Sequence, residues 1–389
     1  MAVKIVRQTN KIALLGAPSS AAARSAGHEG APTALRAAGL VERLKTIGYA
    51  VADLGDDPVQ LYKPDEESPR ARNLTRVLAS LESLKPRVEQ AVKSAALPLI
   101  LAGDCSVALA TVAGARRYFR RVSMIYMDRD ADLNTPAATA TGCVDGMVVS
   151  HLAGRGAAEL VRFWGEPPLV REPDLALFGV ARLDPPEEQL LATSPLRRYL
   201  ASDVQRLGPS AAAQAAIDRI RGNGYQFVLH LDVDVVADFA ATNYPGSGGL
   251  SLAEVREALL VFAQQPELAA LEVTGYNPVK DSDGGGAKLI IDLLVEVLGA
   301  RLKTLQAAEA AAAPPPVAAA AAAGRASSAA PEKTASAQDS APAAAAGEAW
   351  SSDSLDLESD ATTSDDATDA SESSDGSSDS SEESSGSHS

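Results

Sequence analysis

Short apolar runs recur between Lys11 and Pro278 at intervals that leave room for a helix between them. The runs, each bounded by Gly, Pro or Asp, are KIALLGAP, YAVADLGD, LPLILAGD, VSMIYMD, LALFGV, FVLHLDVD and LAALEVTGYNP. Runs of this length and composition predict buried strands. Strands that alternate regularly with helices form βαβ units, which build a parallel sheet covered on both faces. The sequence therefore predicts an α/β fold of three layers, αβα, around a mostly parallel sheet.

The stretches between the runs have helical periodicity. In LSLAEVREALLVFA the apolar residues fall on one helical face, and Ser251 with Glu254 forms a capping box that marks the start of the helix. The stretch RRYLASDV is a weaker candidate for an eighth strand.

The last part of the chain differs sharply in composition from the rest. Residues 306–389 are rich first in Ala and Pro and then in Ser, Asp and Glu. From Thr304 onward, sixteen acidic residues stand against Arg325 and Lys333, so −14 of the formal net charge of −16 lies there. Low hydrophobicity and like-charge repulsion leave no core to offset the ordering entropy, so we expect a disordered tail. The predicted organisation is one folded domain over residues 1–305, followed by this tail.

The nearly neutral remainder restricts the partners. Without an excess of Lys and Arg there is no electrostatic basis for nucleic-acid binding, and a small polar or zwitterionic substrate fits better. Two cysteines, Cys105 and Cys143, are too few for a disulfide framework, so reduced thiols are expected. The N-terminal apolar run is too short for a signal peptide or a membrane span. We therefore expect a cytoplasmic protein that binds neither nucleic acid nor membrane.

Acidic side chains follow three of the predicted strands. They are Asp104 with Cys105 after LPLILAG, Asp128, Asp130 and Asp132 after VSMIYM, and Asp232 and Asp234 after FVLHL. Because the carboxyl ends of strands in an open parallel sheet line the functional crevice, we expect these side chains to meet there.

Carboxylates gathered in one crevice need a positive partner. Two of them about 4 Å apart repel by roughly 4 kcal/mol at an effective dielectric constant near 20. Divalent ions that prefer oxygen ligands, such as Mn²⁺ or Mg²⁺, would supply the charge. The alternative is that some aspartates cap helices or are neutralised by Arg129 and nearby basic side chains. Cys105 is either a soft ligand that favours Zn²⁺ or Fe²⁺, or a buried thiol that binds nothing.

In order and spacing, these motifs resemble those of the ureohydrolase superfamily of arginases, agmatinases and formimidoylglutamases. LAGDCS is similar to G-G-D-H-S, MDRDADLNTP to D-A-H-x-D-I-N-T-P, LDVDVVAD to F-D-x-D-x-x-D, TGCVDG to S-G-N-x-H-G, FGVARLDPPE to I-G-x-R-D-x-D-P-x-E, and LEVTGYNP to D-I-x-E-V-N-P. The resemblance covers residues 11 to about 303. It implies the arginase fold, with an eight-stranded sheet, and a homo-oligomer, commonly a trimer or hexamer.

The resemblance also implies a metal site. Up to two Mn²⁺ ions would be held by Cys105, Asp128, Asp130, Asp132, Asp232 and Asp234. In such a site the ions supply a hydroxide that attacks a guanidinium or amidine carbon. Asp132 would hold that hydroxide and pass its proton to the leaving amine, while Asp145 stands at the position of a proton-shuttling histidine.

A substrate-binding set follows from the same positions. The residues that match contacts to a substrate α-carboxylate are Asn134, Thr139 and Thr141, and those that match contacts to its α-ammonium are Asp184 and Glu187. The alternative is ordinary loop and cap chemistry, since Asn-Thr-Pro and Asp-Pro-Pro form turns in any protein.

The chain departs from the family pattern at positions that carry chemistry. Cys105 and Asp130 replace both metal-binding histidines, Asp145 replaces the shuttle histidine, and Gly275 stands where an acidic residue is expected. A carboxylate in place of imidazole is expected to shuttle protons poorly near neutral pH. Three other histidines lie off the ligand positions and are expected to be ordinary, partly buried or surface residues: His28, His151 and His230.

Three hypotheses about function follow. The first is a divalent-metal-dependent hydrolase that cleaves a C–N bond of a linear guanidine or amidine, such as arginine or agmatine. The second is a catalytically degenerate arginase-like protein with a binding or regulatory role. The third is an interaction protein that uses its acidic tail, with the domain as a scaffold. Retention of five aspartates favours the first, and loss of the histidines and of the acidic residue favours the second.

Overall fold

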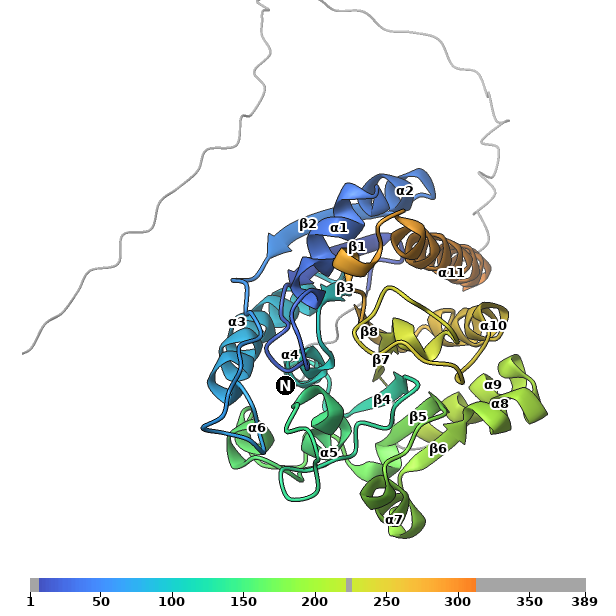
Figure 1. Cartoon of the computed structure of the whole chain (residues 1–389). Helices are drawn as coiled ribbons and strands as arrows, with labels where there is room; N and C mark the ends of the chain where they lie inside the picture. The colour runs from blue at the N-terminus through green and yellow to red at the C-terminus, as the bar shows by residue number, and fades with distance from the viewer. Residues whose placement is uncertain (1–6, 222–225, 313–389) are drawn as a thin grey trace, which may run out of the picture. The chain divides into compact units, whose positions relative to one another are not determined.

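The computed structural model describes residues 7–221 and 226–312, which lie within one compact unit. An eight-stranded sheet forms its centre, with every neighbouring pair of strands parallel and with the order β2-β1-β3-β8-β7-β4-β5-β6 (Figure 1). The strands are β1 Lys11–Ala17, β2 Ala50–Asp56, β3 Leu97–Ala102, β4 Val122–Met127, β5 Leu175–Val180, β6 Arg197–Leu200, β7 Gln226–Asp232 and β8 Leu268–Thr274.

The strand predictions are confirmed, including the weak eighth strand, which is β6. One detail is wrong. The run YAVADLGD does not form a buried strand, because β2 lies at the edge of the sheet and all but one of its residues are exposed. An apolar run alone does not distinguish an edge strand from a central one.

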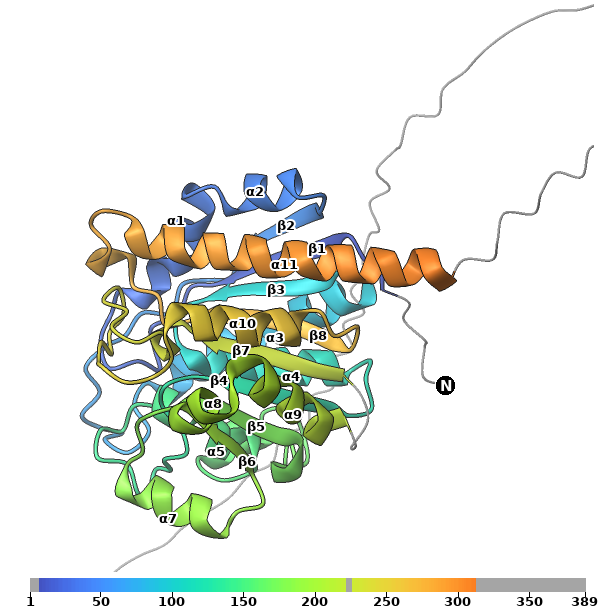
Figure 2. The ribbon, with the colours of Figure 1, turned by 90° about the vertical axis from the view of Figure 1, so that its right-hand side faces the viewer.

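Helices cover both faces of the sheet (Figures 1 and 2). One face carries α1 Ala31–Ala37, α2 Leu40–Thr46, α8 Ala201–Leu207, α9 Pro209–Arg221, α10 Leu252–Ala263 and α11 Gly285–Ala312. The other carries α3 Leu74–Lys93, α4 Ala108–Arg116, α5 Val148–Leu152, α6 Ala158–Arg162 and α7 Pro185–Thr193. Two apolar clusters result, and alternate residues of a strand belong to each: Ile12 and Leu14 face one, Ala13 and Leu15 the other. The three-layer αβα fold is confirmed.

The start of helix α10 and the end of helix α11 can be compared with the sequence predictions. The Ser251 and Glu254 capping box at the start of α10 is present. Helix α11 continues to Ala312, past the predicted domain boundary at Leu305, and the Glu309 carboxylate accepts a hydrogen bond from Thr9. The tail predicted to be disordered lies, apart from these last turns of α11, outside the described residues. Within the described ranges, no helix combines the length and apolar character that a membrane crossing requires.

The strand order places the acidic motifs together. Strands β3, β8, β7 and β4 are consecutive neighbours and all run in the same direction, so the loops that follow them share one edge of the sheet. Cys105 follows β3, Gly275 follows β8, Asp232 ends β7 and Asp128 follows β4.

Candidate active site

A cavity of about 250 Å³ opens at this edge of the sheet. Its lining includes all six residues predicted as metal ligands, namely Cys105, Asp128, Asp130, Asp132, Asp232 and Asp234. It also includes Asp145 and four of the five residues predicted to contact substrate: Asn134, Thr141, Asp184 and Glu187. Thr139 is not part of the lining. The sequence therefore located the pocket.

The backbone holds the carboxylates at the ends of β4 and β7. Asp128 Oδ1 accepts a hydrogen bond from the backbone N–H of Asp130 at 2.7 Å, and Asp232 Oδ1 accepts one from the N–H of Asp234 at 2.8 Å. Each carboxylate therefore caps the turn that follows its strand. For some aspartates, the sequence alone leaves capping as the alternative to metal binding. The caps are present, but each uses only one oxygen of its carboxylate.

Asp132 is held by strained backbone and by a tyrosine. Its φ is +49°, in the left-handed region that non-glycine residues seldom adopt, and its carbonyl accepts hydrogen bonds from the N–H groups of Val149 and Ser150. The Tyr126 hydroxyl donates to the Asp132 carboxylate. Residues in such conformations persist where the surroundings fix them and cluster at functional sites.

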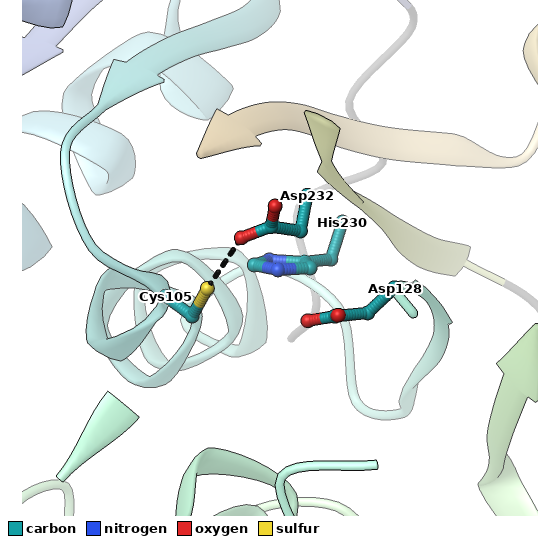
Figure 3. A group of neighbouring side chains, drawn as sticks. All are labelled: Cys105, Asp128, His230 and Asp232. Carbon is teal, nitrogen blue, oxygen red and sulfur yellow. Dashed lines mark hydrogen bonds between the residues drawn. The ribbon is translucent and has the colours of Figure 1, made fainter. Parts of the chain in front are cut away.

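The ligand candidates fall into two groups around Asp128. In the first group, Cys105, Asp128, His230 and Asp232 are all buried, and one ligand atom of each lies within 4.8 Å of the others (Figure 3). The Cys105 thiol donates to Asp232 Oδ2 at 2.9 Å. A thiol, an imidazole and two carboxylates are four donors suited to one divalent ion, so this group fits a metal.

The second group consists of Asp128, Asp130 and Asp234, and its ligand atoms also lie within 4.8 Å of one another. Two guanidinium groups pair with two of its three carboxylates. Arg129 Nη2 donates to Asp234 Oδ2 at 3.1 Å and lies 3.8 Å from Asp130 Oδ2, and Arg182 donates to the same Asp130 oxygen. The charge that a second ion would supply is present in the side chains, so this group does not fit a metal in the way the first does.

Burial shifts the pKa values of the acidic side chains in this pocket. Burial raises the pKa of Asp128, Asp132 and Asp234 well above the ordinary value, and neighbouring carboxylates raise it further. Burial also raises the pKa of Asp130, although Arg182 and Arg129 oppose that rise. The pKa of the Cys105 thiol is raised well above normal by burial and then by Asp232. Burial and neighbouring carboxylates therefore oppose ionisation of these groups, and a bound cation would favour it.

The environment of Asp145 bears on its expected role in proton transfer. Burial raises the pKa of this carboxyl to about 8, against a hydrogen bond from the Tyr244 hydroxyl that lowers it. The backbone N–H of Gly146 donates to its Oδ1 at 2.9 Å. A pKa near the working pH suits general acid–base chemistry, so this environment favours proton transfer by Asp145 near neutral pH, and the role of Asp145 stays a prediction.

The predicted substrate contacts separate into two kinds. Asn134 Nδ2 donates to Asp184 Oδ2 at 2.9 Å, and both side chains border the cavity with Thr141. Glu187 accepts hydrogen bonds from the N–H groups of Leu133 and Asp184, both at 2.8 Å, and completes the capping box of α7. Thr139 Oγ1 accepts from the N–H groups of Thr141 and Gly142 in the loop itself. For Glu187, Thr139 and also Thr141, whose Oγ1 accepts a hydrogen bond from the Cys143 N–H at 3.2 Å, the loop and cap chemistry of the alternative is present.

The histidines differ from expectation, because all three are buried and none lies on the surface. His28 and His151 have structural partners: their Nε2 atoms accept hydrogen bonds from the backbone N–H groups of Asn243 and Ala157. His230 lies in the first ligand group, and the sequence reasoning missed it. The signal was its position two residues before Asp232, which puts both side chains on one face of β7.

Steric contact with Asp232 explains the glycine at position 275. Its φ is +81°, and a Cβ atom added there would lie 2.2 Å from Asp232 Oδ1. Any side chain at this position would require the Asp232 carboxylate to move, so the missing acidic residue and the present geometry of the first group are linked.

Comparison with known proteins agrees with this geometry. The arginase family model matches residues 10–299. The arginase of Bacillus subtilis (strain 168) is 30% identical over 294 residues, covering 75% of this chain and 98% of its own, and that of Bacillus caldovelox is 29% identical over 297 residues, covering 75% and 99%. The crystal structure of arginase from Bacillus cereus superposes with a TM-score of 0.69 at 27% identity, covering 74% of this chain and 98% of its own.

Similarity of fold reaches beyond arginases. The structure of a formimidoylglutamase from Bacillus subtilis superposes with a TM-score of 0.61 at 18% identity, covering 75% of this chain and 87% of its own. The family match over most of the chain, the all-parallel eight-stranded sheet and the acidic pocket at its edge lead to one conclusion: this chain belongs to the arginase family of hydrolases.

Proposed function

We propose that this chain hydrolyses a C–N bond of a linear guanidine or amidine, of the arginine or agmatine type, with the help of a divalent metal ion. One observation carries the proposal: the acidic cluster, Asp145 and the Asn134–Asp184 pair line a single cavity. A cavity rich in carboxylates favours a cationic guanidinium or amidinium, because charge-assisted hydrogen bonds to carboxylates are strong.

The chain's own residues have distinct parts in this reaction. Asp128 and Asp232 would hold a divalent ion, which would supply hydroxide near neutral pH by lowering the pKa of a water molecule. Asp132, fixed by Tyr126, orients the attacking water by hydrogen bonding. Asp145, with its pKa near 8, holds a proton that it gives to the leaving amine. Asn134, Thr141 and Asp184 bind the far end of the substrate and fix its distance from these groups.

A second candidate function has a specific observation in its favour. Arg129 and Arg182 are paired with Asp234 and Asp130, and both family histidines are replaced. This arrangement favours an arginase-like protein that binds a guanidine or amidine without hydrolysing it, in a binding or regulatory role.

Turnover and binding assays separate the two candidates. The full-length protein, loaded in turn with Mn²⁺ and Zn²⁺, is given arginine, agmatine and further linear guanidines and amidines, while calorimetry measures binding. We expect release of urea or ammonia that is lost in Asp232→Asn and kept in Arg256→Ala, whose ion pair with Glu296 is exposed. Binding without turnover under every loading would contradict hydrolysis and support the second candidate.

The remaining expectations stay proposals. Manganese as the metal and a homo-oligomer, trimer or hexamer, are what the family resemblance implies, whereas a cytoplasmic location is expected from the low cysteine content. Light scattering of the purified protein tests the oligomer, and metal analysis of protein purified without added metal tests the ion.

A further inference from the structure

We propose that the centre of this protein holds one divalent ion, bound by Cys105, Asp128, His230 and Asp232, and that the guanidinium groups of Arg129 and Arg182 take the place of a second ion. The role of this ion rests on the proposed function. The proposal adds to that function the ligands and the kind of metal. It adds a histidine that the motif comparison does not assign, and it limits the metal content to one ion per chain.

The orientation of His230 is the first argument. Its imidazole is fully buried, and its Nδ1 atom lies 2.7 Å from Glu272 Oε1. Because a carboxylate oxygen accepts, Nδ1 carries the hydrogen, which leaves the lone pair of Nε2 directed away from Glu272. Figure 3 shows the ring between the carboxylates of Asp232 and Asp128, with the Cys105 thiol nearby. The imidazole is therefore in the tautomer that a metal requires.

Glu272 and Tyr126 hold that ring. Strand register places Tyr126 beside His230 on β4 and Glu272 beside it on β8. The Tyr126 ring stacks on the imidazole at 4.1 Å with an interplanar angle of 3°. A carboxylate behind a histidine is the usual partner of a metal-binding imidazole, because it fixes the ring and raises its basicity. Glu272 is fully buried, and its second carboxylate oxygen has no hydrogen-bond partner. Burial of such an oxygen costs folding free energy, which favours a functional role for Glu272.

The donor atoms converge on one place. The Thr274 hydroxyl lies 3.2 Å from Asp232 Oδ2, 3.3 Å from His230 Nε2 and 3.5 Å from the Cys105 sulfur. Three ligand atoms from two different segments thus surround a single oxygen. Sulfur, nitrogen and oxygen donors together favour Zn²⁺, Co²⁺ or Fe²⁺ over Mn²⁺.

The arginines on the other side complete the argument. The Arg129 side chain is only 4% exposed, and Nη2 is also bound to the Tyr244 carbonyl at 2.7 Å, so it cannot swing into solvent freely. Arg182 covers Asp130 from the outer side and is 58% exposed. A second ion beside Asp130 and Asp234 would meet these two positive charges at close range, and that repulsion opposes its binding.

Metal analysis of the full-length protein tests the proposal. Saturation with Zn²⁺ or Co²⁺, followed by removal of free ion, is expected to leave one equivalent per folded chain. The Co²⁺ form is expected to show a thiolate charge-transfer band in the near ultraviolet that Cys105→Ser abolishes. Glu272→Gln, a positioning variant, is expected to lower Co²⁺ affinity by about 10- to 100-fold. His230→Gln is expected to lower it more, and Arg256→Ala serves as the matched control without effect.

The opposite half gives an independent result. Arg129→Ala combined with Arg182→Ala frees Asp130 and Asp234, so the metal content of this double variant is expected to rise towards two equivalents. Should it fail to fold, shown by circular dichroism, the Cys105 and Glu272 variants still decide. Two equivalents in the unmodified protein, no binding of either Zn²⁺ or Co²⁺, or unchanged Co²⁺ affinity in both His230→Gln and Glu272→Gln would each overturn the proposal. One bound ion per chain without turnover would contradict the proposed hydrolysis but not the single-ion site. Two bound ions per chain with turnover would contradict the single-ion site but not the hydrolysis.

Discussion

The two halves of the acidic cluster share Asp128 and lie at the same sheet edge, yet they are neutralised differently. In one half, Asp130 and Asp234 have guanidinium partners supplied by the chain. In the other, the side-chain partners described for Cys105, His230 and Asp232 are one another, Thr274, Glu272 and Tyr126, and none of them is a lysine or arginine. Carboxylates gathered by a parallel sheet need positive charge. The fold provides it through arginine side chains in one half, and in the proposal above an exchangeable ion provides it in the other.

The motif comparison shows where this asymmetry enters. Arg129 stands at the alanine of D-A-H-x-D-I-N-T-P, and Arg182 at the first aspartate of I-G-x-R-D-x-D-P-x-E. Asp130 stands at the histidine beside the first of these. Relative to the family pattern, the formal charge changes by +1 at Arg129, by +2 at Arg182 and by −1 at Asp130, so the three replacements together add two positive charges.

The largest effect on stability is expected from removing an arginine that pairs with Asp130 or Asp234. Arg129→Ala leaves the buried Asp234 without its partner, and loss of one member of a buried ion pair costs about 3 kcal/mol or more. Urea denaturation measures the free energy of unfolding, with Arg182→Ala, whose side chain is more exposed, as the milder comparison. An equal cost for both variants would contradict the difference in burial between the two pairs.

Removal of the ion is expected to affect the other half. Chelation lowers the melting temperature of the unmodified protein, because a ligand at a hundredfold excess over its dissociation constant contributes about 2.7 kcal/mol. Asp232→Asn and Asp128→Asn are expected to abolish that response and to raise stability without metal, since a like charge is removed. A chelator response that persists in both variants would place the ion elsewhere.

The pH dependence of stability provides a smaller test. Asp145 has a folded pKa of about 8, above its ordinary value of 3.8, so the folded state binds more protons between these pH values. Its contribution is therefore fully present below about pH 4 and is lost as pH rises through 8, at no more than about 1.4 kcal/mol per pH unit. Asp145→Asn should flatten this part of the curve measured by urea denaturation in metal-free buffer. An unchanged slope would show that Asp145 is ionised in the folded protein at neutral pH.

The smallest effect is expected from the acidic tail. A chain ending at Ala312 keeps all of α11 and its contact with Thr9, so it should melt within a few degrees of the full chain. It should also bind the same single equivalent of Co²⁺, although many carboxylates have been removed with the tail. A fall in tightly bound metal on truncation would assign part of the metal response to the tail.

Much of the molecule followed from local pattern. Each apolar run became a strand, the Ser251 capping box became the start of α10, and the carboxylates after β4 and β7 met in one pocket. These features depend on residues close together in the sequence, or on the rule that parallel strands end at one edge. For the same reason, the exposed β2 could not be foreseen, because its place at the sheet edge depends on strand order.

The sequence by itself determined the family, the three-layer fold and the position of the acidic pocket, since periodicity and motif spacing are properties of the chain alone. Only the tertiary structure decided which carboxylates have a partner. Asp234 is paired with Arg129 from a different strand end, and His230 gains its orientation from Glu272 on the neighbouring strand. Such pairings depend on distances between segments far apart in sequence, and the free energy of a buried charge is set by those distances.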